Sequence, residues 1–427
     1  MTALPAFSMA TSKPQQLSLI GAVAIGLASM LGAGVFFVWS TAWEKANDQI
    51  FVALALAALV ASLNAASVYQ LASHVSRAGG VYSYSRVYLP KEFSFIAGFS
   101  FVFGKIASIA AIAIIIETYL LPGYQGWPAA VAAVLLMTAL NLLGINRTAQ
   151  MAAVLAITTI SFIVFSITTG FAHGLSANSF STEMLMPSAS LSTLSAASLI
   201  FFAFAGYARV ATLGDEVRDP KKNIPKAIAI SLSAVLVIYL LITIVFIGIL
   251  QPSNEAVPAA VFEAMVSITA SWFPTWLIDL VVVGASLGSI LALLAGVSRT
   301  AATMAEDREL PKVFAKRNRF AAPWLAEVII AIGAITLIET AQYTQWVIAF
   351  SSFSVLLYYA IGHISAFMQP KEERRQPRIF AVLGFLLCLL LLTNVPGPAV
   401  SISTVILVIA VLIRYALRRV AMSRTEN

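Results

Sequence analysis

The chain has 427 residues, of which 60% are apolar and only 11% are charged, and its mean hydropathy is +0.90. Soluble domains have about 45–50% apolar and about 25% charged residues, so a soluble fold of this composition would expose large apolar patches. The composition therefore excludes a large soluble catalytic or nucleic-acid-binding domain. It indicates an all-α integral membrane protein, because helices satisfy their own backbone hydrogen bonds in lipid.

Twelve apolar runs are long enough to be transmembrane helices, which need about 20 residues each. In chain order they are 18–40, 50–72, 93–118, 127–145, 148–172, 191–213, 227–250, 273–298, 323–341, 344–368, 379–395 and 398–413. We refer to them below as segments 1 to 12. The connections between them are too short to be domains, so we expect one polytopic domain over residues 1–427.

The basic residues predict the orientation of the chain. All but three of the 26 Lys and Arg lie at the two ends or in the connections after even-numbered segments. The exceptions are Lys45, Lys105 and Arg209. Because Lys and Arg collect in cytoplasmic loops, we expect a multi-pass protein of the cell membrane with both termini in the cytoplasm. The same bias explains the net charge of +7 without an anionic partner.

Segments 1 and 6 are interrupted by small residues at nearly the same depth. The interruptions are residues 29–34 (SMLGAG) and residues 203–207 (AFAGY). The first five segments, 18–172, and the next five, 191–368, must have opposite orientations. Matching interruptions in two such halves are the best sequence sign of an inverted repeat with a binding site near the bilayer midplane.

An unwound stretch leaves amide and carbonyl groups unpaired, which is costly in lipid, and a zwitterionic ligand can pair with both. For a carboxylate, the positive end of the second half-helix offers the amides of Gly32, Ala33 and Gly34 and the hydroxyl of Ser29. For an ammonium, the free carbonyls lie near Ile25, Met30, Phe202 and Ala205. The alternative is that the small residues only let helices pack closely.

Four stretches occur in an order that is specific to one family. They are residues 29–36 (SMLGAGVF), 77–84 (RAGGVYSY), 201–207 (FFAFAGY) with 215–228 (DEVRDPKKNIPKAI), and 298–311 (SRTAATMAEDRELP). Together they resemble the amino acid–polyamine–organocation (APC) transporters over segments 1–10. The resemblance implies the five-plus-five inverted repeat called the LeuT fold, with discontinuous helices 1 and 6, two additional helices in 379–413, and transport by alternating access.

The resemblance also implies functional roles for particular residues. A gating aromatic of segment 6 aligns with Phe202, and Phe201 and Phe204 are the alternatives if the alignment is shifted. The loops 215–226 and 306–319 resemble inner-gate segments, and we expect their mixed charges to form salt bridges that rearrange on opening.

Two departures from the family pattern concern ion coupling. Many relatives carry Glu directly after the Gly-aromatic pair of segment 6, where this chain has Ala208 and Arg209. Proton-coupled relatives carry a Lys in segment 5, where this chain has Thr159, or Thr158 in a shifted alignment. We expect Arg209 to pair with Asp215 or Glu216, or else to repel cationic substrates.

Lys105 lies in segment 3, about 18 Å from its cytoplasmic start at a rise of about 1.5 Å per residue. An ammonium at that depth must find water, a partner or neutrality. Three roles remain open: a titrating group in proton coupling, a fixed charge that replaces a cation site, or a structural contact to backbone carbonyls. A separate possibility is a sodium site formed by Thr159, Ser286 and Ser289 against the carbonyls of segment 1.

These observations predict a secondary active transporter of a small neutral amino acid that works by proton symport or exchange. The buried charges are positive and no acidic group lies near the midplane, so a neutral substrate is favoured. Cationic amino acids and polyamines are the alternative. A transport-inactive amino-acid sensor is a further alternative function. The chain has one cysteine and three histidines, so we expect no enzymatic activity, metal or cofactor. The expected partners are an amino acid, H⁺ and the lipid bilayer, with no nucleic acid.

Overall fold

In the computed structural model, the described residues are 16–121, 124, 126–176, 179–180, 184, 190–204, 206–250, 260–340, 344–395 and 397–423. They form helices, turns and loops, with one isolated parallel bridge between Leu17 and Val217. The helices of the first half are α1 Leu19–Met30, α2 Ala33–Ala46, α3 Ile50–Ala72, α4 Val81–Tyr88, α5 Lys91–Leu120, α6 Pro128–Asn141 and α7 Ile145–His173.

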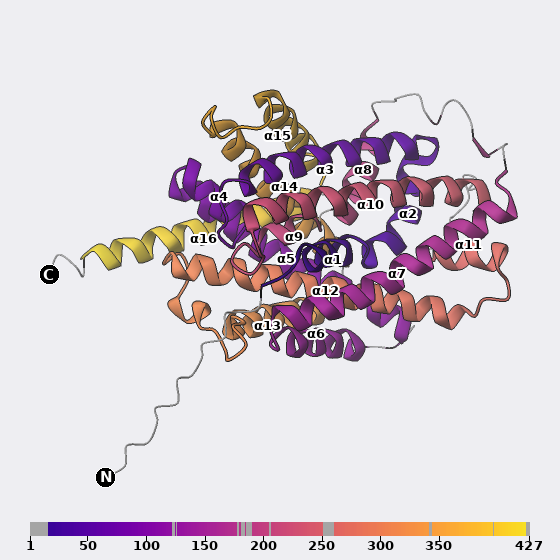
Figure 1. The fold of residues 1–427 in the computed structure, drawn as a ribbon, viewed down its shortest axis with the longest axis horizontal. Coiled ribbons are helices and arrows are strands. Elements are labelled where there is room, and N and C mark those ends of the chain that lie inside the picture. Colours follow the sequence, from indigo (N-terminus) through magenta and orange to yellow (C-terminus); the bar gives the residue numbers. More distant parts are fainter. Residues whose placement is uncertain are drawn as a thin grey trace, which may run out of the picture.

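The second half continues with helices only. They are α8 Leu191–Phe204, α9 Ala208–Ala211, α10 Pro220–Leu250, α11 Val261–Thr269, α12 Thr275–Glu306, α13 Trp324–Thr340, α14 Thr344–Met368, α15 Arg378–Leu392 and α16 Gly397–Ser423. The long helices α3, α10 and α7 run along the long axis of the molecule, and α10 packs against both of the others (Figure 1).

The apolar runs of the sequence coincide with these helices, but their ends often do not. Segments 50–72 and 344–368 match α3 and α14 at both ends. In contrast, α10 begins at Pro220 rather than at 227, and α12 continues to Glu306 rather than ending at 298. Hydropathy marks where lipid contact ends, whereas a helix continues as long as its backbone hydrogen bonds do. The short helices α4 and α11 have no counterpart among the predicted segments.

Within the described residues, six helical stretches are long and apolar enough to cross a membrane. Five further apolar helices are shorter, and two of them, α1 and α8, are the first halves of the interrupted segments 1 and 6. The composition and these helices identify an all-helical integral membrane protein. The count of twelve crossings and the inverted repeat stay predictions.

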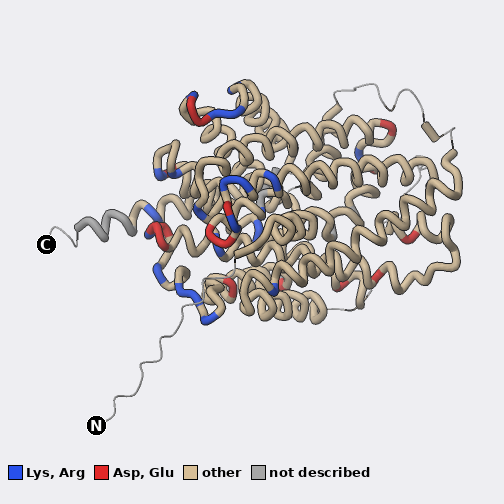
Figure 2. The backbone as a smooth tube through the Cα atoms, in the orientation of Figure 1, with Lys and Arg blue, Asp and Glu red and all other residues tan. Residues whose placement is uncertain are grey.

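Charged residues gather at one end of the molecule, the end that holds α4, while the opposite end carries few (Figure 2). The helix bodies between the two ends are almost free of charge in the same view. Lys105 of α5, Arg209 of α9 and Glu327 of α13 are the exceptions that matter below, because each is at most 3% exposed.

Candidate substrate site

The interruptions of segments 1 and 6 touch each other. The first lies between α1, which ends at Met30, and α2, which begins at Ala33. The second follows the end of α8 at Phe204. A Cβ atom added to Gly206 would lie 2.5 Å from the backbone C and O atoms of Ser29. Only glycine permits this approach, so the small residues bring the two breaks into direct contact.

Two hydroxyl groups from other helices support the breaks. Tyr239 of α10 donates its hydroxyl to the carbonyl of Met30 at 2.8 Å and lies 3.2 Å from the carbonyl of Ala203. Ser289 of α12 donates to the carbonyl of Ala28 at 3.1 Å. The carbonyl of Met30, predicted to bind a ligand ammonium, therefore already has one partner within the chain. Neither hydroxyl has this role in the sequence-based predictions, because a contact between distant helices leaves no local pattern.

A small cavity lies where the two breaks meet. Its volume is about 30 Å³, which holds water but is too small for an amino acid, so the site must open to admit one. The lining residues are Ser29, Met30, Gly32, Gly34, Lys105, Ser108, Ile112, Phe202, Ala203, Gly206, Arg209, Ser289 and Leu293. The structure thus brings together most of the predicted binding residues, adds Arg209 to them, and places Lys105 beside them.

Hydrogen-bond donors without a partner lie at this cavity. Gly32 is the N-cap of α2 and no side chain caps this helix. The amide of Val35 donates to the carbonyl of Gly32 at 3.1 Å, whereas the amides of Ala33 and Gly34 have no partner within the helix. The hydroxyl of Ser29 is buried and has no hydrogen-bond partner among the described residues. Both features suit a carboxylate, as the sequence predicts.

Three of the predicted residues lie elsewhere. Ile25 is buried within α1 and does not line the cavity. Thr159 and Ser286 donate to carbonyls of their own helices, those of Leu155 at 2.8 Å and of Val282 at 2.7 Å. Ala205 lies outside the described residues. The sodium site and the coupling role of Thr159 stay predictions.

Of the three phenylalanines considered for the gate, Phe202 lines the cavity. Phe201 packs against Tyr359, with ring centroids 6.2 Å apart, and Phe204 packs against Tyr239 at 4.6 Å. Both of these rings are buried in helix contacts. Phe202 is therefore the one of the three that could touch a bound substrate, which agrees with the alignment.

Arg209 does not form the predicted ion pair with Asp215 or Glu216, and that prediction is wrong. Asp215 instead accepts the amide of Ala78 at 3.1 Å, and Glu216 pairs with Arg299. The reason is that Arg209 lies in α9, in the cavity wall, before the chain reaches the charged loop. Its guanidinium carbon lies 5.1 Å from the centroid of the Phe101 ring, and Nε and Nη1 have no hydrogen-bond partner among the described residues.

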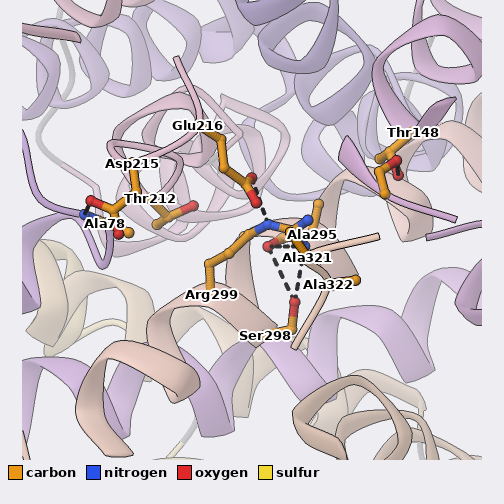
Figure 3. A network of polar contacts seen from close by, with 12 residues as sticks. Ala78, Thr148, Thr212, Asp215, Glu216, Ala295, Ser298, Arg299, Ala321 and Ala322 are labelled. Carbon is orange, nitrogen blue, oxygen red and sulfur yellow. Dashed lines mark hydrogen bonds and ion pairs between the residues drawn. The ribbon is translucent and has the colours of Figure 1, made fainter. Parts of the chain in front are cut away.

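A buried ion-pair network lies beyond α9, toward the charged end. Arg299 lies within α12 rather than in a connection and is 2% exposed. Its Nε donates to Glu216 at 2.8 Å and its Nη1 to Glu327 at 3.2 Å, and Figure 3 shows Arg299 between Glu216 and Ser298. Glu327 of α13 is fully buried. Sequence reasoning missed it, although a carboxylate inside an apolar segment is a sign of function or pairing.

The loops at the charged end form further ion pairs, as predicted for residues 306–319. Arg77 pairs with Asp307 at 2.9 Å, and Glu309 pairs with Arg86 at 3.0 Å and with Arg414 at 2.6 Å. These contacts join the loop after α3, α4, the loop after α12, and α16. Near them Tyr88 donates to Glu373 at 2.6 Å, and this hydrogen bond lowers the pKa of Glu373 below its usual value.

Comparison with known proteins identifies the family. The family model described as amino acid permease matches residues 17–417. This chain belongs to the amino acid permease family. The match places it in the APC superfamily, as its motifs predict, among transporters rather than enzymes.

The permease is similar to three relatives that illustrate the range of the family. An uncharacterized transporter of Mycobacterium tuberculosis is 37% identical over 97% of this chain and 93% of its own. The branched-chain amino acid permease BcaP of Bacillus subtilis is 22% identical over 90% and 88%. Cationic amino acid transporter 6 of Arabidopsis thaliana is 28% identical over 69% of this chain and 55% of its own.

Proposed function

We propose that this permease is a secondary active transporter that moves a small amino acid across the cell membrane by alternating access. The observation that carries the proposal is the cavity at the contact of the two helix breaks. It is lined by Ser29, Gly32, Gly34 and Phe202, residues selected from the sequence for an amino-acid site. The names of BcaP and of the Arabidopsis relative add that proteins of this family carry amino acids.

In the proposed bound state, the α-carboxylate of the substrate accepts hydrogen bonds from the first amides of α2 and from Ser29. The positive end of α2 adds a favourable electrostatic contribution. The ammonium binds backbone carbonyls at the breaks, each of which has a second lone pair even where Tyr239 or Ser289 occupies the first. Phe202 then covers the bound molecule.

Alternating access requires that the charged end open and close. The network of Arg299, Glu216 and Glu327 joins α12 and α13 to the loop that follows α9. Since α9 also carries part of the cavity wall, a displacement of α9 changes the cavity and the network together. We propose that these pairs separate when the site opens to the cytoplasm, with the two five-helix repeats moving relative to each other.

Proton symport or exchange is the proposed mode of coupling, and Lys105 is the proposed group. It is 3% exposed and lines the cavity. Among the described residues, no backbone carbonyl accepts a hydrogen bond from it, which disfavours the purely structural role. A change in its protonation would act directly on a charged substrate in the same cavity.

The charge of the cavity also bears on the substrate. Lys105 and Arg209 both line it, and both would repel a cationic side chain or a polyamine. The proposed substrate is therefore an amino acid whose side chain carries no positive charge. Because the Arabidopsis relative is named as a cationic amino acid transporter, the test below includes cationic substrates.

The test is counterflow in proteoliposomes that contain the purified protein and a mixture of unlabelled amino acids. We expect saturable uptake of at least one labelled amino acid other than arginine or lysine. Uptake of arginine, lysine or putrescine alone would establish the cationic alternative. A ligand that raises the melting temperature of the protein without any flux would indicate a sensor and contradict the proposal.

A further inference from the structure

The walls of the substrate cavity contain two basic side chains and no acidic one. Lys105 and Arg209 are 3% and 1% exposed, and no Asp or Glu is among the described residues that line the cavity. Three carboxylates of other parts of the fold have other partners: Glu216 and Glu327 pair with Arg299, and Glu117 accepts the amide of Ala130 at 2.8 Å.

Two buried cations without an anion are unfavourable in an empty site. A buried charge persists when it is paired and hydrogen-bonded, and two buried like charges also repel each other. Arg209 has a ring contact with Phe101, but its Nε and Nη1 atoms have no hydrogen-bond partner among the described residues. These unsatisfied donors indicate that an anion joins them during the transport cycle.

The α-carboxylate of an amino acid does not meet this need by itself. The amides at the start of α2 and the hydroxyl of Ser29 are already suited to that group. A neutral amino acid would moreover bring an ammonium next to two cations, without a side-chain carboxylate to offset their charge.

We propose that the substrate carries a second carboxylate, so that this permease transports an acidic amino acid. The side-chain carboxylate lies between Lys105 and Arg209, and the guanidinium binds it with two parallel hydrogen bonds, the geometry that arginine favours with carboxylates. The α-carboxylate remains at the amides of α2. The inference rests on the proposed function and narrows its substrate, an amino acid without a positively charged side chain, to one with a negatively charged side chain.

The test compares labelled glutamate, aspartate, glutamine, leucine and arginine in the counterflow assay, with glutarate as an unlabelled competitor. Glutamine matches glutamate in shape without its second charge. We expect uptake of glutamate or aspartate at least tenfold above that of glutamine, and little competition by glutarate, which lacks the ammonium.

The other outcomes separate the two proposals. Uptake of leucine or glutamine without glutamate and aspartate overturns the second carboxylate and leaves amino-acid transport intact. Competition by glutarate as strong as that by glutamate overturns recognition of an amino acid and keeps the two-carboxylate site. No uptake of any of the five overturns both proposals.

Two variants test the residues themselves. In Lys105→Met and Arg209→Gln the ratio of glutamate to glutamine uptake should fall toward one, whereas Lys45→Met, an exposed lysine in α2, should leave it unchanged. Because each change removes an unpaired buried charge, the melting temperature of the ligand-free protein should rise, while the stabilisation by glutamate should disappear. A lower melting temperature with an unchanged uptake ratio would assign both residues to the structure and overturn the proposal.

Discussion

Arg299 and Arg209 are two buried arginines in opposite situations. Arg299 has two carboxylates, Glu216 and Glu327, as ion-pair partners. Arg209 has no ion pair among the described residues and faces a cavity. Paired charges of the first kind hold parts of a fold together, whereas unpaired donors of the second kind are available to a ligand. The sequence shows both only as basic residues at or within apolar segments.

We expect Arg299→Met to destabilise the protein by about 3–5 kcal/mol, because it leaves buried carboxylates without their partner. The measurement is thermal unfolding of the purified protein in detergent. The matched control is Arg317→Met, which removes an exposed pair with Glu306 at 3.5 Å and should change stability by at most about 1 kcal/mol. Equal effects of the two changes would contradict the structural role of Arg299.

We expect Phe202→Ala to weaken substrate uptake by about tenfold or more, equivalent to about 1.4 kcal/mol of binding free energy, while the melting temperature changes little. The reason is that the Phe202 ring lines the cavity and is not buried in a contact between helices. Phe171→Ala, at a ring that is 46% exposed in α7, serves as the control. Unchanged uptake in Phe202→Ala would remove this residue from the gate.

At the scale of helices, α10 supports both interrupted segments, α1–α2 and α8–α9. The Tyr239 hydroxyl of α10 lies within hydrogen-bond distance of a carbonyl at each break, Met30 and Ala203. It also packs its ring against Phe204 and Trp39. This one side chain therefore fixes the relative position of the two half-helices that form the site.

We expect Tyr239→Phe to destabilise the protein by about 1–3 kcal/mol, because buried carbonyls lose a donor while the ring contacts remain. Thermal unfolding measures the change, and Tyr124→Phe, at a ring that is 62% exposed, is the control. A variant as stable as the wild type would show that Tyr239 does not hold the breaks.

Many of the helical segments and the two helix breaks could be predicted from the sequence. Runs of apolar residues located α3 and α14 to the residue, and the glycines at 32 and 206 located the two breaks. Both signals are local, since hydropathy and missing side chains are properties of a short stretch of chain.

The parts that could not be predicted depend on contacts between distant residues. Glu327 pairs with Arg299 across two helices, and Tyr239 reaches the breaks from α10. The sequence suggests that Arg209 pairs with the charged loop, because it lies six residues before Asp215. The turn at the break instead places Arg209 in the cavity wall. The neighbouring sequence has no pattern that predicts this placement.

For the whole molecule, the distribution of charge supports the proposed orientation. The basic residues lie mostly at the end that holds α4 (Figure 2), and basic residues favour the cytoplasmic side. The ion pairs of Arg77, Arg86, Arg299 and Arg414 lie in the same part of the protein. The proposed transport cycle therefore opens and closes a site whose cytoplasmic side is bounded by paired charges.

The location of the site can be tested by alkylation of a single cysteine. Cys388 is buried and is the only cysteine of the chain. Its Sγ lies 3.3 Å from the amide oxygen of Asn64, a contact that serine can replace. Cys388→Ser therefore provides a background in which Ser29→Cys places one thiol in the cavity, and Ser365→Cys places one at a buried position of α14.

The measurement that tests the account most directly is the rate at which a maleimide labels the Ser29→Cys variant in proteoliposomes, with and without a transported amino acid. The account predicts labelling that a saturating concentration of that amino acid slows at least tenfold, and no labelling of the Ser365→Cys variant. A labelling rate of the Ser29→Cys variant that no transported amino acid alters would contradict a substrate site between the two helix breaks.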